Sequence, residues 1–154
     1  MFEECRIEGD FLLSSGKKSN VFYDFDLLEP RQMLEYVDKL CLKLQGIDFD
    51  YVVSPAIGGI IPGWLVAGEF GKKFLSVDKE GKLRGWPYTA VDVTLPQKNN
   101  KYIIVDDVIS TYGTAKRIAE SIPSFKCVAI AAFIFRGKKI LKNTFVLEYK
   151  EEEK

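Results

Sequence analysis

The sequence predicts an α/β fold, in which one mostly parallel sheet carries helices on both faces. Strand-like and helix-like segments alternate along almost the whole chain, which is the order that a parallel sheet requires. The strand candidates Tyr102–Val105 and Cys127–Phe135 are continuous apolar runs, which are typical of strands covered on both faces. The chain has no internal repeat and no linker, so we expect a single domain over residues 1–154.

Three segments have helical patterns. Pro30–Leu44 carries apolar residues at helical spacing and has proline near its start, where a helix tolerates it. Ile60–Phe70 combines large apolar residues with a face of small ones, and 115–122 repeats apolar residues at the same spacing. We therefore expect a helix in each segment.

The remaining elements are strands and turns. We expect strands at Tyr51–Ser54, Lys72–Val77, Thr89–Leu95, Tyr102–Val105, Cys127–Phe135 and Thr144–Tyr149. The segment Lys79–Pro87 is polar and contains two glycines and a proline, so it is expected as a loop.

Composition limits the classes of partner. Of the 154 residues 47% are hydrophobic, which is enough for a proper core. Lys plus Arg equal Asp plus Glu at 22 each, so no global field attracts nucleic acid or an anionic membrane. No apolar run approaches the length of a membrane span, and the first residues lack the features of a signal peptide. We expect a cytoplasmic protein.

The chain contains no histidine, which excludes Ser-His-Asp and Cys-His catalysis and the usual metal sites that use histidine. Its cysteines are Cys5, Cys41 and Cys127, whose odd number and wide spacing argue against disulfides or a zinc site. Cys41 and Cys127 lie in apolar patterns and are expected to be buried thiols.

The segment after the strand at 102–105 combines two acidic residues with a polar loop. Asp106 and Asp107 are expected at the carboxyl end of the strand, where open α/β sheets bind ligands. Hydroxyls and backbone N–H groups then open a helix, whose N-terminus favours an anion; the loop residues are Ser110, Thr111, Tyr112, Gly113 and Thr114. A ligand that carries both vicinal hydroxyls and a phosphate, such as ribose 5-phosphate, would suit this arrangement. The alternative is an ordinary strand-to-helix turn with capping residues.

A second candidate anion loop is Ser54–Ile60, which also leaves a strand and enters a helix. Gly58 and Gly59 allow the backbone to approach a ligand closely and to present N–H groups to it. A plain Gly-Gly turn is the alternative. The loop Ser54–Ile60 lies one βα unit before the acidic segment, and this position favours the ligand-binding interpretation.

The segment 102–115 resembles the signature of the type I phosphoribosyltransferases, in which an apolar strand, two acidic residues and a Thr/Gly loop bind 5-phosphoribosyl 1-pyrophosphate. The resemblance implies that Asp106 and Asp107 lie by the ribose 2- and 3-hydroxyls and that Ser110–Thr114 holds the 5-phosphate. It also implies a pyrophosphate loop with an unusual peptide conformation, formed by Ala56, Ile57, Gly58 and Gly59. The implied fold is a mostly parallel five-stranded sheet with helices on both faces and a small N-terminal hood.

Two further segments are similar to the orotate phosphoribosyltransferase branch of that family: Gly9–Asp24 and Asp78–Gly85. The second resembles a mobile catalytic loop, so Lys79 and Lys82 are implied to neutralise a leaving pyrophosphate; otherwise the loop is a solvated charged turn. Arg136 follows a strand where the branch has an arginine that meets the orotate carboxylate. A surface arginine is the alternative there.

The chain departs from the branch at five positions. Ser14 replaces a lysine, Asp78 an arginine and Arg84 a histidine. Phe135 stands where an aspartate is usual, and Tyr112 stands where the family has a small residue. The Tyr112 side chain would either crowd the phosphate loop or point to solvent, and the carboxylate of Asp78 would repel a pyrophosphate.

The resemblance implies transfer of a 5-phosphoribosyl group between pyrophosphate and a nucleobase, expected to be a pyrimidine. It implies a homodimer and Mg²⁺, which would be held through water and pyrophosphate near Asp106 and Asp107. A regulator that binds phosphoribosyl pyrophosphate or a nucleotide without catalysis is the first alternative, since Ser14 and Asp78 depart from the catalytic pattern. Purine transfer is the second.

Overall fold

The structure, a computed structural model, describes residues 1–13, 16–85 and 100–150. Its α-helices are α1 (Pro30–Lys43), α2 (Ile60–Phe70) and α3 (Gly113–Ser121), and short 3-10 turns η1 (Glu3–Cys5) and η2 (Phe25–Leu27) lie near the N-terminus. Its strands are β1 (Arg6–Leu12), β2 (Lys18–Tyr23), β3 (Tyr51–Pro55), β4 (Lys73–Val77), β5 (Leu83–Gly85), β6 (Lys101–Ile109), β7 (Lys126–Phe135) and β8 (Thr144–Tyr149).

The main sheet has six strands in the order β5-β4-β3-β6-β7-β8. Strands β4, β3, β6, β7 and β8 run parallel, and β5 pairs antiparallel with β4 at one edge. The expected five-stranded parallel core is therefore present, but the expected loop at Lys79–Pro87 is wrong in part. Leu83–Gly85 turns back to form β5, because Asp78–Lys82 makes a tight turn that brings it beside β4.

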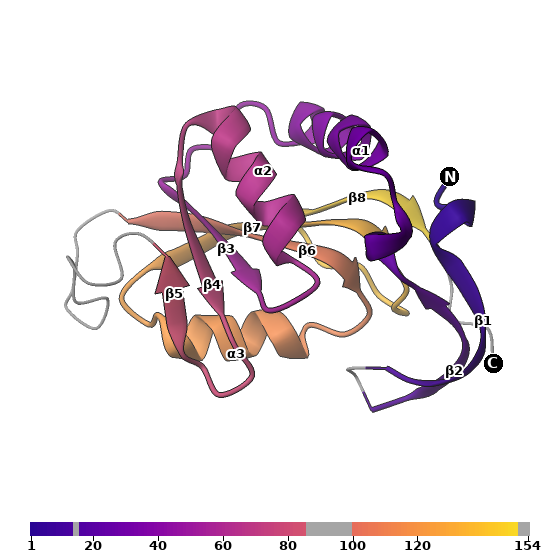
Figure 1. The fold of residues 1–154 in the computed structure, drawn as a ribbon. Coiled ribbons are helices and arrows are strands. Elements are labelled where there is room, and N and C mark those ends of the chain that lie inside the picture. Colours follow the sequence, from indigo (N-terminus) through magenta and orange to yellow (C-terminus); the bar gives the residue numbers. More distant parts are fainter. Residues whose placement is uncertain (14–15, 86–99, 151–154) are drawn as a thin grey trace.

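Helices cover both faces of the sheet, as Figure 1 shows, with α1 and α2 on one side and α3 on the other. Alternation along the strands explains this arrangement, since successive side chains point to opposite faces. Val52 and Ile103 pack with α1 and α2, whereas Val53 and Ile104 pack with α3. The predictions of an α/β fold and of a helix in each of the three segments are confirmed.

The N-terminal segment forms a separate two-stranded antiparallel sheet of β1 and β2, which we call the hood. Figure 1 shows the hood beside the end of the main sheet at which β6 ends. Buried side chains of β2 join the core beneath α1, so the hood is packed on the body. The predicted small N-terminal hood is thus present.

Several boundaries differ from the sequence predictions. The strand expected at Tyr102–Val105 continues to Ile109, because β7 goes on pairing with it after the β3 ladder has ended at Ile104. Cys41 is buried as expected. The prediction for Cys127 is wrong, because this residue lies near the start of β7 and is exposed there. The strand expected at Thr89–Leu95 lies outside the described residues.

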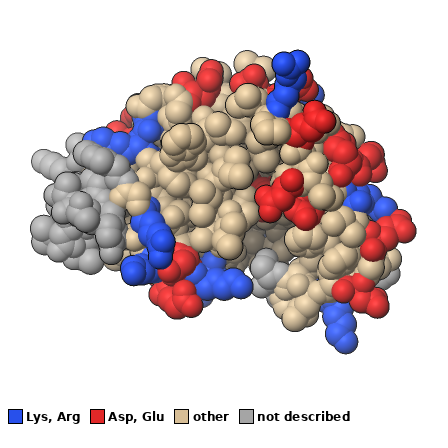
Figure 2. All heavy atoms as spheres, in the orientation of Figure 1, with Lys and Arg blue, Asp and Glu red and all other residues tan. Residues whose placement is uncertain are grey.

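Charged side chains of both signs are interspersed over the described part of the face in Figure 2, in keeping with the equal numbers of acidic and basic residues. Within residues 1–13, 16–85 and 100–150, no helix is long and apolar enough to cross a membrane.

Candidate functional site

A cavity of about 570 Å³ lies where the hood meets the carboxyl ends of the sheet strands. The space-filling view shows the surface hollowed between the body and the hood (Figure 2). The body contributes parts of both candidate anion loops and the acidic pair, and the hood contributes Leu12, Leu13, Phe22 and Tyr23. A site at this edge is where the ends of parallel strands meet and side chains from several loops converge.

Asp106 and Asp107 lie in β6, just beyond the end of its pairing with β3. One oxygen of Asp106 accepts a hydrogen bond from the Asp107 N–H at 2.8 Å, and one oxygen of Asp107 accepts from the Val108 N–H at 2.7 Å. Burial and the neighbouring Asp107 raise the pKa of Asp106 well above its ordinary value, and burial also raises the pKa of Asp107. The structure therefore holds two neighbouring, partly buried carboxyl groups at a cavity wall, where a ligand's hydroxyls or a cation would stabilise their ionised forms.

The loop before α2 touches the acidic pair. A Cβ added at Gly58 would lie 2.5 Å from an oxygen of Asp107, and one at Gly59 would lie 2.9 Å from the carbonyl oxygen of Val105. Only glycine allows the loop to approach β6 this closely, because any side chain would meet these groups. The peptide bond between Ala56 and Ile57 is cis. Ala56 and Gly58 line the cavity, while Ile57 projects outward and is 83% exposed.

The loop Ser110–Thr114 follows β6 and opens α3, and all five of its residues line the cavity. Tyr112 is the N-cap of α3, so the first N–H groups of the helix face the same space. The Thr111 hydroxyl accepts only a long 3.4 Å bond from the Gly113 N–H. Hydroxyls, N–H groups and the positive end of the helix dipole can together bind a phosphate here.

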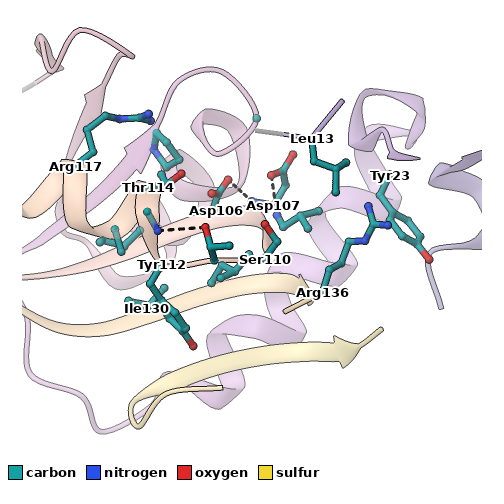
Figure 3. A pocket seen from close by; sticks show the side chains of 18 of the residues that line it. Leu13, Tyr23, Asp106, Asp107, Ser110, Tyr112, Thr114, Arg117, Ile130 and Arg136 are labelled. Carbon is teal, nitrogen blue, oxygen red and sulfur yellow. Dashed lines mark hydrogen bonds between the residues drawn. The ribbon is translucent and has the colours of Figure 1, made fainter. Parts of the chain in front are cut away.

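The Tyr112 side chain follows neither of the two courses expected from the sequence. It does not enter the cavity or point to solvent, but packs on Phe135 and reaches Thr144 of β8 with its hydroxyl. Figure 3 shows its ring directed away from Asp106 and Asp107, toward the side on which β8 lies. A tyrosine is therefore compatible with a phosphate in this loop.

Arg117 is a cavity residue that the sequence analysis missed. It lies on α3 one helical turn after Thr114, and its positive charge lowers the pKa of Asp106, against the effects of burial and Asp107. Its Nε is buried and has no hydrogen-bond partner among the described residues. The spacing from Thr114 was a usable signal, because residues three apart on a helix lie on the same face.

Arg136 is buried, with 4% exposure, so the surface-arginine alternative is wrong. Its guanidinium donates to the Val21 carbonyl and to the Ser19 hydroxyl, both at 3.0 Å, and lies 5.5 Å from the centre of the Tyr23 ring. These contacts tie the end of β7 to the hood at the cavity wall, and Figure 3 shows the arginine beside Tyr23. Arg136 thus fixes the position of the hood over the site.

The two candidate lysines lie in or beside the turn after β4. Both are exposed, and Lys79 also lines the cavity. The Asp78 carboxylate accepts hydrogen bonds from the N–H groups of Glu80 and Lys82, at 3.0 and 2.8 Å. These bonds, that of Lys82 foremost, lower the pKa of Asp78. Asp78 therefore shapes the turn that carries the lysines, a role that its sequence position alone did not reveal.

Comparisons with known proteins agree with this arrangement. No protein-family model matches the chain. The orotate phosphoribosyltransferase of Campylobacter hominis is 36% identical over 152 residues, covering 89% of this chain and 69% of the relative. That of Campylobacter jejuni subsp. jejuni is 33% identical over 154 residues, covering 93% of this chain and 73% of the relative.

Solved structures share the fold. Orotate phosphoribosyltransferase from Aeropyrum pernix has a TM-score of 0.67 at 24% identity, covering 86% of this chain and 76% of the other. Adenine phosphoribosyltransferase from Thermoanaerobacter pseudethanolicus has a TM-score of 0.70 at 22% identity, covering 94% of each chain. The fold is thus common to enzymes named for different bases, whereas both of these sequence relatives carry the same name. The chain belongs to the orotate phosphoribosyltransferase family.

Proposed function

We propose that the protein transfers a 5-phosphoribosyl group between pyrophosphate and a pyrimidine base, with orotate as the first candidate. The observation that carries the proposal is the convergence of three groups on one cavity: the acidic pair, the Ser110–Thr114 loop and the glycine loop at Ala56–Gly59. They match the ribose hydroxyls, the 5-phosphate and the pyrophosphate of phosphoribosyl pyrophosphate. The names of the sequence relatives support orotate over a purine.

The chemistry that this site must support is loss of pyrophosphate from the ribose C1, with positive charge developing on the ring. Asp106 and Asp107 hold the ribose through its hydroxyls, and the Ser110–Thr114 loop fixes its other end. Holding both ends orients C1 toward the incoming base, which lowers the entropy cost of the reaction. The apolar hood residues that line the cavity exclude water.

Negative charge that develops on the leaving pyrophosphate needs stabilisation. The backbone of the loop at Ala56 and Gly58 and the side chain of Lys79 line the same cavity and are proposed to supply it. We include Lys82 in this role, since it stands on the same turn. Arg136 is included as the anchor of the hood and as a candidate for contact with the base.

Mg²⁺ is part of the proposal. The described residues contain no group of three or more side chains able to hold a metal by themselves. Asp106 and Asp107 provide two carboxylates, which fits Mg²⁺ because this ion keeps several waters and is usually bound by one or two carboxylates and substrate phosphates. When bound, the ion would screen the pyrophosphate charge.

A turnover assay tests the function. We expect the protein, given phosphoribosyl pyrophosphate and Mg²⁺, to consume orotate faster than adenine, hypoxanthine or uracil. Tight binding of phosphoribosyl pyrophosphate without turnover of any base would contradict catalysis and favour a binding regulator. Preference for a purine would contradict the assignment of the base.

We also propose that the protein acts as a homodimer in the cytoplasm. If the exposed lysine turn completes the partner's site, a Lys79→Ala/Lys82→Ala chain mixed with an Asp106→Asn/Asp107→Asn chain will regain part of the lost activity. A dimer whose subunits exchange but which regains no activity would rule out a shared site. Sedimentation of the parent provides the test of its oligomeric state.

A further inference from the structure

The loop Ser110–Thr114 is attached to the far edge of the sheet by Tyr112. The Tyr112 hydroxyl accepts a hydrogen bond from the Leu141 N–H at 2.8 Å and shares a second, of 2.9 Å, with the Thr144 hydroxyl. Its ring lies 6.1 Å from the ring of Phe135. One side chain of the loop thus contacts the end of β7, the connection to β8 and the start of β8.

The start of the loop is held independently. The Arg136 N–H donates to the carbonyl of Ile109 at 2.7 Å, which ends the β6–β7 ladder. A Cβ added at Gly137 would lie 2.0 Å from the carbonyl oxygen of Ser110, so the loop rests directly on the backbone after β7. The loop is therefore supported at Ser110 and, two residues later, at Tyr112.

These two supports leave the groups suited to phosphate on the other side of the loop. Figure 3 shows Tyr112 pointing one way, while Ser110 and Thr114 stand on the side of Asp106. A small residue at position 112 has no side chain that reaches β8, so its loop lacks this attachment. A loop ordered before the ligand arrives loses less conformational entropy on binding.

We propose that Tyr112 is a positioning residue that holds the 5-phosphate loop in its binding conformation through the β7–β8 connection. This inference rests on the proposed function of the loop. It concerns affinity for the phosphate end of the ligand, and Tyr112 itself touches no reacting atom. Its hydroxyl acts through Leu141 and Thr144, and its ring through Phe135.

The experiment compares Tyr112→Phe and Tyr112→Gly with a matched control, Tyr149→Phe. Tyr149 also stacks on Phe135, at 5.4 Å, and its hydroxyl donates to the Gly137 carbonyl at 2.9 Å, but it is not in the cavity wall. Calorimetry would measure two probes, ribose 5-phosphate and inorganic pyrophosphate. The second reports on the Ala56–Gly59 loop, which Tyr112 does not contact.

We expect Tyr112→Phe, which loses both hydrogen bonds of the hydroxyl, to weaken ribose 5-phosphate binding by about fivefold or more, and Tyr112→Gly to weaken it further. Pyrophosphate affinity should stay unchanged in both variants, and Tyr149→Phe should change neither probe. Unchanged affinity for ribose 5-phosphate in Tyr112→Phe would overturn the proposal, because the hydroxyl would then have no role in binding. An equal loss of affinity for both probes would also overturn it, because it would indicate general disruption of the site.

A measurement without ligand separates this inference from the proposed function. Hydrogen exchange of the Gly113 and Thr114 amides should be faster in Tyr112→Phe than in the parent, and unchanged in Tyr149→Phe. If the parent fails to bind ribose 5-phosphate but exchange still rises, the proposed function is wrong and the attachment stands. If exchange does not rise, the attachment is wrong whatever the ligand.

Discussion

The loop Ser110–Thr114 and the turn Asp78–Lys82 both border the cavity, but they are held in different ways. The loop is supported by β7, by the β7–β8 connection and by β8. The turn is held by bonds within itself, from its own N–H groups to Asp78. The first is held by contacts with other elements of the fold, whereas the second depends on short-range bonds between its own residues.

This contrast indicates that the two segments have separate roles. The part proposed to bind the phosphoribosyl group is built into the sheet, and the part proposed to stabilise the leaving pyrophosphate is local and exposed. Binding then requires little reorganisation, while catalysis depends on how the lysine turn meets the ligand. Mutations in the two parts should therefore have different signatures, in affinity for the first and in turnover for the second.

The largest effect is expected from Asp106→Asn with Asp107→Asn. The double variant should lose affinity for phosphoribosyl pyrophosphate by more than about a hundredfold, because it removes both carboxylates that are proposed to bind the ribose and a hydrated cation. Calorimetry checks the affinity. If the double variant binds phosphoribosyl pyrophosphate as tightly as the parent, the assignment of the ribose site is wrong.

The same variant should unfold less readily than the parent at neutral pH. Burial and Asp107 raise the pKa of Asp106 in the folded state, so the folded protein binds its proton more tightly than the unfolded chain. The free energy of unfolding therefore falls as pH rises from the ordinary aspartate pKa through the raised value. Asparagine does not titrate, so the variant does not lose this stability. Urea unfolding at acidic and neutral pH checks this. A double variant less stable than the parent at neutral pH would indicate a structural role for the pair.

The next effect is expected from Gly58→Ala, which places a methyl group 2.5 Å from an oxygen of Asp107. Affinity for phosphoribosyl pyrophosphate should fall about tenfold or more, since relief of the clash, which costs about 1–3 kcal/mol, displaces the loop or the carboxylate. Gly68→Ala is the control, because its Cβ meets nothing within 4 Å and alanine favours a helix. Equal affinities for Gly58→Ala and the parent would show that the two loops are not coupled.

The smallest effect is expected at Asp78, and it sharpens the contrast between the two segments. Asp78→Ala removes the acceptor of two N–H groups, so the lysine turn should loosen and kcat should fall about fivefold, with the affinity for phosphoribosyl pyrophosphate unchanged. Asp78→Asn keeps an acceptor oxygen and should retain kcat. Steady-state kinetics with calorimetry checks both. A fall in kcat for Asp78→Asn as large as that for Asp78→Ala would show that the charge, not the turn, matters.

Sequence reasoning located the elements and the acidic pair because their signals are contiguous. Periodicity places α2 at Ile60–Phe70, and Asp106 and Asp107 lie beside their loop in the chain. It did not reveal where Tyr112 points, because the partner Thr144 is 32 residues away. It left two alternatives for Arg136, contact with the base or a position on the surface. The reason is that Ser19 and Val21, which accept its hydrogen bonds, belong to a separate small sheet. Such contacts depend on tertiary packing, which local patterns do not encode.

A crystal structure of the protein with ribose 5-phosphate would test the proposed phosphoribosyl site most directly. We expect the phosphate in the Ser110–Thr114 loop, bound by backbone N–H groups and at least one hydroxyl, with the ribose hydroxyls on Asp106 or Asp107. Tyr112 should remain on Thr144. A phosphate bound elsewhere, or Tyr112 turned into the loop in the presence of excess ligand, would contradict the account.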